Sequence, residues 1–182
     1  MSTAIINFEK TTIMDRIIKL VESLNRPGTE EVVKYLKSSN FNTVHGGGSH
    51  HKYRGGLIDH SLEVYENMKE KTKKKGISPE SVIICSIFHD LGKTITQSKH
   101  WVKSIEILDR CGFELTEEER QAILNHHEVL IEDIVMPKNL GTYLKKSDML
   151  STGEYKAANP KKSRSCKQNA FNTLLTMWSK LK

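Results

Sequence analysis

The chain has 182 residues, of which 37% are hydrophobic and 27% charged, and it carries 28 lysines and arginines against 22 aspartates and glutamates. This length suits one domain with a single sizeable core, and the composition excludes a disordered chain. No apolar run approaches the roughly 20 residues that a membrane-spanning helix needs, which excludes a protein built on such helices.

The termini, the cysteines and the basic surplus indicate where the protein acts and on what. The N-terminal stretch MSTAIINFEK lacks the features of a secretory signal, and Cys85, Cys111 and Cys166 form no CxxC pair, so we expect a cytoplasmic protein with reduced thiols. The net charge of +6 favours polyanionic partners such as nucleotides, nucleic acid or acidic membranes. We expect an anionic phosphate substrate and no membrane partner. The lysine runs at 69–75 and 161–167 are also explained by solvated helix faces. Nothing in the sequence supports an oligomer.

Helical periodicity dominates the first third of the chain. Residues 11–24 place apolar side chains on one stripe and predict a first helix. Thr29 is expected to cap a second helix that reaches about Lys37. A glycine-rich loop follows, and Leu57 begins a long helix that Gly76 ends.

The remaining elements are also predicted as helices. Ser78-Pro79 is a start signal, with a capping serine and a proline at the first helical position, for an apolar helix that reaches about Asp90. Thr116 with Glu119 forms a capping box. Further helices are expected over 101–110, 117–127, 140–150 and 163–181.

The chain contains no convincing alternating strand, so the predicted fold class is all-α. We expect residues 1–182 to form a single domain. Its core covers 45–150, short helices precede it over 11–38, and a basic helical tail follows over 160–182.

Several polar side chains fall on apolar helix faces. His60 shares its face with leucine, valine and methionine, His89 and Asp90 end the most hydrophobic helix, and Asp148 continues the stripe of Leu140 and Leu144. Such groups are costly to bury unless they are paired or bind a metal. Imidazoles and carboxylates together suit Mn, Fe, Co, Zn or Mg. A buried His–Asp hydrogen-bond network without metal explains the pattern equally well.

The pattern GGLIDH…FHDLGK…SDML resembles the HD superfamily of metal-dependent phosphohydrolases, whose signature is H…HD…D. This chain supplies the signature as His60, His89-Asp90 and Asp148, and the resemblance covers about 45–150. It implies an HD-like helical bundle with a divalent metal between the helices, held by these four residues. The motif is nearest to the HD domains of a bacterial 3′→5′ exoribonuclease and of nucleotide phosphohydrolases.

The resemblance implies a second set of ligands. Some members hold two ions, and here KHWVKSIEIL and ILNHHE supply His100, His126 and His127. Many relatives have a longer insertion before the first of these histidines, so the position of His100 is open. Each of the three could instead support a ligand or contact the substrate. The downstream GYP signature of cyclic-dinucleotide phosphodiesterases is missing, so that substrate is not assigned.

The resulting hypothesis is a phosphohydrolase that cleaves a nucleotide or nucleic-acid phosphoester with a metal-activated water. By resemblance Asp90 bridges the metals if there are two. Lys93, one turn past the HD pair, is placed to neutralise a phosphate oxygen, although a lysine at a helix C-terminus can also be catalytically idle. His51, Tyr53 and Arg54 precede the first ligand helix and are expected to bind the substrate.

Two other functions stay open. The first is a nucleotide- or nucleic-acid-binding HD module that keeps the fold without turnover. The second is partner binding by the basic C-terminal helix, whose apolar stripe is more often core packing: Phe171, Leu174, Leu175 and Trp178.

Overall fold

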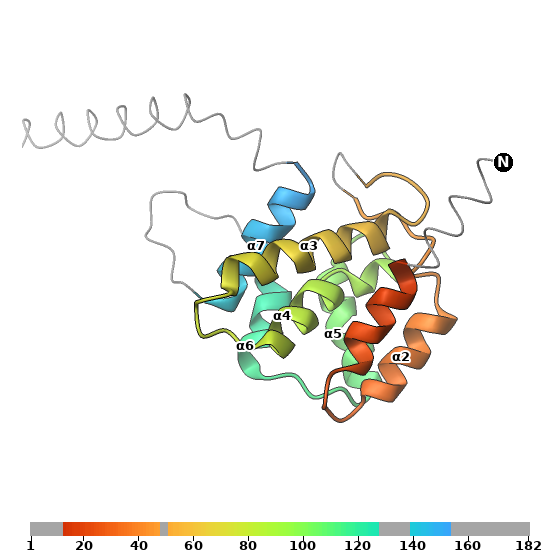
Figure 1. The fold of residues 1–182 in the computed structure, drawn as a ribbon. Coiled ribbons are helices and arrows are strands. Elements are labelled where there is room, and N and C mark those ends of the chain that lie inside the picture. Colours follow the sequence, from red (N-terminus) through yellow and green to blue (C-terminus); the bar gives the residue numbers. More distant parts are fainter. Residues whose placement is uncertain (1–12, 48–50, 128–138, 154–182) are drawn as a thin grey trace, which may run out of the picture.

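The computed structural model describes residues 13–47, 51–127 and 139–153 of the chain (Figure 1). Within these ranges the regular elements are all helices, and the only β-type pairing is an isolated bridge between Gly47 and His51. The predicted all-α fold is therefore confirmed. None of the helices in the described ranges combines the length and the hydropathy that a membrane-spanning segment requires.

The observed helices follow the predicted ones closely. A first helix covers 13–22, where 11–24 was predicted, and the rest are α2 (Thr29–Ser38), α3 (Gly56–Thr72), α4 (Pro79–Phe88), the short 3-10 helix η1 (Leu91–Thr94), α5 (His100–Arg110), α6 (Glu117–Asn125) and α7 (Leu140–Ser151). The predicted helix over 163–181, with its apolar stripe, lies outside the described residues, as does the whole of the predicted 160–182 tail. That residues 1–182 form one domain stays a prediction.

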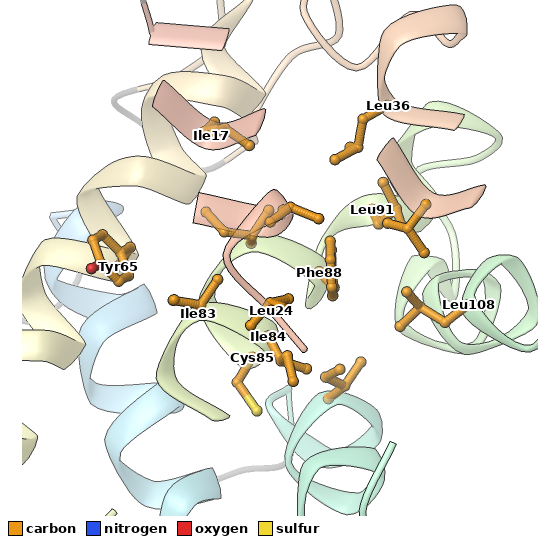
Figure 2. Close-up of a cluster of buried hydrophobic side chains, with 14 of the residues drawn as sticks. Ile17, Leu24, Leu36, Tyr65, Ile83, Ile84, Cys85, Phe88, Leu91 and Leu108 are labelled. Carbon is orange, nitrogen blue, oxygen red and sulfur yellow. The ribbon is translucent and has the colours of Figure 1, made fainter. Parts of the chain in front are cut away.

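Helix α4 is the centre of the fold. Every residue from Val82 to Phe88 is buried, so this helix is apolar on all sides and needs neighbours all round. It contacts α3, α6 and α7 (Figure 1). Figure 2 shows Ile83, Ile84 and Phe88 among side chains from the first helix, α2 and α5. The residues that directly follow α4 are therefore carried into the interior of the protein.

Two of the predicted helix starts differ from the structure. The side chain of Ser78 makes no capping hydrogen bond, so the start of α4 depends on Pro79 at its first turn. The cap of α2 is Gly28, not Thr29. Gly28 has φ +80°, and a Cβ there would lie 2.4 Å from the Phe113 nitrogen, so only glycine fits. The predicted Thr116–Glu119 capping box is confirmed.

The turn after α4 is packed against α5. The Gly92 amide donates to Ser104 Oγ at 2.8 Å, and this hydroxyl donates to the His89 carbonyl at 2.9 Å. A Cβ on Gly92 would lie 2.0 Å from the His100 carbonyl oxygen. The HDLGK sequence therefore needs its glycine because the backbone of α5 approaches the turn at this point.

A buried ion pair joins the segment after the first helix to α4 and α6. Both terminal nitrogens of Arg26 donate hydrogen bonds to the Glu119 carboxylate, at 2.7 and 2.9 Å. Ser81 Oγ and the Thr116 amide also donate to that carboxylate, at 2.6 and 2.8 Å, and the Glu119 side chain has no exposed surface. Burial raises the pKa of Glu119, but the hydrogen bonds from Arg26, Ser81 and Thr116 lower it by more than burial raises it. The pKa therefore lies below its ordinary value of 4.5.

Gly92→Ala should destabilise the protein by at least about 3 kcal/mol, because the new methyl group would collide with the backbone of α5. Gly141→Ala is the matched control: a Cβ there meets Ala122 at ordinary distances of 3.6 and 3.8 Å, so it should be neutral or stabilise by up to about 1 kcal/mol. Chemical denaturation measures both. Equal stability of the two variants would contradict the close approach at Gly92.

Arg26→Met should cost about 3–5 kcal/mol at neutral pH, because it leaves the Glu119 carboxylate buried without its cation. Since the folded-state pKa of Glu119 is lowered, the stabilisation that the ion pair gives is fully present above pH 4.5. It is lost as the pH falls through the folded-state pKa. The difference between variant and wild type should therefore shrink in acid. Urea denaturation at neutral pH and in acid measures this difference in the free energy of unfolding. Arg120→Met, which breaks an exposed pair with Asp109, should cost less than about 1 kcal/mol.

Candidate metal centre

The four residues of the predicted primary site lie together in the interior. His60 comes from the middle of α3, His89 directly follows α4, Asp90 precedes η1 and Asp148 comes from α7. The first three are buried, and the Asp148 side chain is 15% exposed. Three helices and one turn therefore deliver nitrogen and oxygen donors to one place.

The donor atoms of this group are close to one another. His60 Nε2 lies 3.1 Å from His89 Nε2, 3.3 Å from Asp90 Oδ2 and 3.3 Å from Asp148 Oδ1. His89 Nε2 lies 3.4 Å from the same Asp90 oxygen. The spacing in sequence could not show which atoms would meet.

The second predicted set gathers at the other oxygen of Asp90. Oδ1 lies 2.7 Å from His100 Nε2 and 3.7 Å from His126 Nε2, and His127 Nε2 lies 2.9 Å from that of His100. Lys99, with the left-handed φ of 50°, directly precedes His100 at the start of α5. The short connection before His100, which left its position open, therefore does bring this residue to Asp90.

These residues form three sets of donor atoms that lie within 4.8 Å of one another and could hold a metal ion. The sets are Asp90 with His100, His126 and His127; His60 with His89 and Asp90; and His89 with His126 and Asp148. Asp90 belongs to the first two sets and turns one carboxylate oxygen toward each. The arrangement suits one ion or a pair that shares Asp90.

The other ring nitrogen of three histidines is held by a backbone carbonyl. His89 Nδ1 bonds to Ser86 O at 3.0 Å and His126 Nδ1 to Ile123 O at 2.7 Å, each a carbonyl in the last turn of a helix that lacks an intrahelical partner. His100 Nδ1 bonds in the same way to the carbonyl of Gln97 at 2.9 Å. A carbonyl only accepts, so Nδ1 carries the hydrogen and Nε2 of the neutral ring presents a lone pair to the centre.

A divalent cation fits this donor set. The lone pairs of His89 and His100 face the oxygens of Asp90, which are acceptors as well. Asp90 Oδ1 and His126 Nε2 are buried, and neither has a hydrogen-bond partner within the described part of the chain. Buried acceptors that face one another are costly, and a cation between them removes that cost. The second ring N–H of a metal-bound histidine usually donates to a carboxylate, a backbone carbonyl or water, and in these three histidines it donates to a carbonyl.

Comparison with protein families agrees with this geometry. The HD domain model matches residues 57–162, more than half of the chain, and this range includes His60, His89-Asp90 and Asp148. The chain belongs to the HD domain family. A search of curated proteins and a search of solved structures each found no match. The resemblance to metal-dependent phosphohydrolases is therefore confirmed at the level of the superfamily.

The ionisable groups of the centre shift one another's pKa values. We call this group of residues the HD centre: His60, His89, Asp90, His100, His126, His127 and Asp148. Burial raises the pKa of Asp148, but hydrogen bonding with His60 and the nearby histidines lower it more, to about 2. Burial lowers the pKa of His60, but the carboxylates of Asp148 and Asp90 raise it more, to about 9. Burial lowers the pKa of His89, and burial with the two neighbouring histidines lowers that of His127 to about 4. Both carboxylates are thus ionised and His89 and His127 are neutral, as metal ligation requires, whereas His60 must give up a proton when it binds a metal.

Lys93 lies at the edge of the centre under the glycine-rich loop. Its Nζ donates to Asp90 Oδ2 and to the Gly46 carbonyl, both at 2.5 Å, and its side chain is 9% exposed. A Cβ on Gly47 would lie 3.1 Å from this nitrogen, and one on Gly56 would lie 2.1 Å from the His51 carbonyl oxygen. The glycines therefore let the loop close on itself and cover the lysine.

The predicted substrate-binding residues take different positions. His51 is buried, with its ring centroid 5.3 Å from that of His60. Tyr53 is 42% exposed and donates to Asp59 Oδ2 at 2.6 Å, and Arg54 is exposed. The structure thus brings His51 to the centre and leaves the other two on the surface. The roles of all three residues in substrate binding stay predictions.

Sequence reasoning missed two residues next to the HD centre. Ser151 Oγ lies 3.0 Å from His60 Nδ1, and the Trp101 ring centroid lies 4.8 Å from that of His127. Ser151 is three residues after Asp148 in one helix, so its shared face was available as a signal. For Trp101 only its position beside His100 pointed to the centre.

Adding Mn²⁺, Co²⁺ or Zn²⁺ to the metal-free protein should raise its Tm, because the ion binds the folded donor set and not the unfolded chain. The gain in stability should reach about 2.7 kcal/mol at a hundredfold excess over Kd. Asp90→Ala should remove the shift, whereas the surface variant Asp109→Asn should keep it. Differential scanning calorimetry measures all three. A wild-type Tm that none of the ions raises would contradict the metal assignment.

Proposed function

We propose that this HD domain is a divalent-metal-dependent phosphohydrolase that cleaves a nucleotide or nucleic-acid phosphoester with water as the attacking group. One observation carries the proposal: Asp90 is buried between two histidine groups and turns one carboxylate oxygen to each. A pair of cations that shares a carboxylate suits phosphoryl transfer, which needs both the attacking and the leaving oxygen stabilised.

The proposal assigns each group to one ion. His60, His89, Asp90 and Asp148 would hold the first ion, and Asp90, His100, His126 and His127 would hold the second. Mn, Fe, Co, Zn and Mg all accept this mixture of nitrogen and oxygen donors. When bound, such ions lower the pKa of water and polarise a phosphoryl oxygen.

The chain supplies the remaining positive charge through Lys93. Its ammonium group lies against Asp90 at the edge of the centre, and its side chain is nearly buried, so its charge is poorly screened by water. We assign it to a non-bridging phosphoryl oxygen, where it would stabilise the charge that develops during the reaction. The contact with the Gly46 carbonyl fixes the ammonium position before substrate arrives.

The loop before α3 is assigned to the rest of the substrate. His51 stands beside His60, and Arg54 is exposed and can contact a phosphate through two nitrogens. Tyr53, which is also partly exposed, offers a ring that can stack on a base. The basic surplus of the chain favours the same anionic substrates.

A substrate panel tests the proposal. The purified chain is assayed with Mn²⁺ or Co²⁺ on a model phosphodiester, nucleoside mono- and triphosphates, and single-stranded RNA and DNA. We expect metal-dependent turnover of at least one substrate and none above background for Asp90→Ala. Lys93→Met should still bind metal, because every assigned ligand remains, and should lose about 10²–10³ in kcat, because it removes the charge assigned to the phosphoryl oxygen together with the hydrogen bonds to Asp90 and Gly46.

The controls separate catalysis from binding. Asp109→Asn, far along α5 and paired only on the surface, should turn over like the wild type. Binding of a nucleotide or nucleic acid without any turnover would mean a non-catalytic binding module. Full activity in Asp90→Ala would refute the assigned site.

A further inference from the structure

His60 lacks the carbonyl partner that orients His89, His100 and His126. His89 and His126 follow helix ends, and His100 begins a helix, so each finds a carbonyl outside the regular helical ladder. His60 lies inside α3, where backbone carbonyls accept from amides four residues later. Its Nδ1 therefore needs a partner from another element.

That partner is the hydroxyl of Ser151 on α7. Ser151 Oγ lies 3.0 Å from His60 Nδ1, and the residue is only 4% exposed. The hydroxyl donates to Glu63 Oε2 at 2.7 Å. A carboxylate only accepts, so the single hydroxyl hydrogen is committed to Glu63. Ser151 Oγ must then accept from His60 Nδ1–H, which leaves His60 Nε2 pointing into the centre.

The two helices supply this arrangement through equal spacing. His60 and Glu63 lie three residues apart on α3, and Asp148 and Ser151 lie three residues apart on α7. Residues at this spacing share a helix face, and α3 and α7 lie side by side (Figure 1). Helix α7 therefore delivers both Asp148 and the hydroxyl that orients the histidine opposite it.

The same carboxylate also reaches the glycine-rich loop. His51 Nε2 lies 3.3 Å from Glu63 Oε2, the oxygen that accepts from Ser151. A chain of contacts thus runs from the loop through Glu63 and Ser151 to His60.

We propose that Ser151, held by Glu63, is a positioning residue that keeps His60 with Nε2 aimed at the metal. The proposal rests on the function assigned above, in which His60 is a ligand. Because the side chain of Ser151 touches neither metal nor substrate in this role, its effect is exerted through His60 alone. Loss of such an outer partner typically lowers metal affinity about 10–100-fold.

Metal binding by the metal-free full-length chain tests the proposal without an activity assay. Co²⁺ is titrated into the wild type, Ser151→Ala, Ser151→Thr and Glu63→Ala, and followed by its visible absorption and by calorimetry. We expect about a 10–100-fold loss of affinity in Ser151→Ala, a smaller loss in Glu63→Ala and wild-type affinity in Ser151→Thr, which restores the hydroxyl. Ser147→Ala is the matched control, since it removes a buried hydroxyl one turn earlier on the same helix and should bind Co²⁺ like the wild type.

The outcomes are distinct. Thermal unfolding without metal should give one cooperative transition for both variants, with a lower midpoint for Ser151→Ala because it loses two hydrogen bonds, which separates orientation from general loss of structure. Wild-type affinity in Ser151→Ala, or an equal loss in Ser147→Ala, would overturn the positioning role while the metal site stands. Absence of Co²⁺ binding in the wild type would overturn the proposed function, and the role of Ser151 with it.

Discussion

The buried carboxylate of Asp90 is the constraint on which the rest of the HD centre depends. It lies among four histidines and a lysine, with one oxygen toward His60 and His89 and the other toward His100 and His126. Carbonyls and one serine hold the outer nitrogens of these rings, so their inner nitrogens face a group that also only accepts. The arrangement is unfavourable by itself and becomes favourable around cations, which is why we interpret it as a metal centre.

Helix α4 explains how the chain carries such a group into its interior. Its apolar surface is covered on all sides, and polar clusters stand at its two ends. At its start Ser81 donates to the Glu119 carboxylate, which Arg26 neutralises within the chain. At its end Asp90 has Lys93 and a set of imidazoles. The polar groups of the first cluster are hydrogen-bonded within the protein, and that cluster has a structural role. In the second, Asp90 Oδ1 and His126 Nε2 have no hydrogen-bond partner within the described residues.

The sequence was sufficient for features that depend on local pattern. Periodicity predicted the helices, and polar residues on apolar faces predicted that His60, His89, Asp90 and Asp148 would meet. It did not predict that Gly28 replaces Thr29 as a cap, because that depends on the distant Gly112–Phe113 backbone. Nor did it predict the Arg26–Glu119 pair, since a hydrogen bond between residues 93 positions apart leaves no local signature. For Ser151 the face shared with Asp148 was a signal, but nothing local named His60 as its partner.

Anomalous diffraction from crystals of the metal-free protein soaked in Mn²⁺ or Zn²⁺ tests the central claim most directly. The account predicts one peak in contact with Asp90 Oδ2 and the ring nitrogens of His60 and His89. It predicts a second peak in contact with Asp90 Oδ1 and the ring nitrogens of His100 and His126. A single peak at Asp90 would contradict the pair of ions that shares Asp90, while a metal centre with one ion would stand. No peak within ligand distance of Asp90 would contradict the account as a whole.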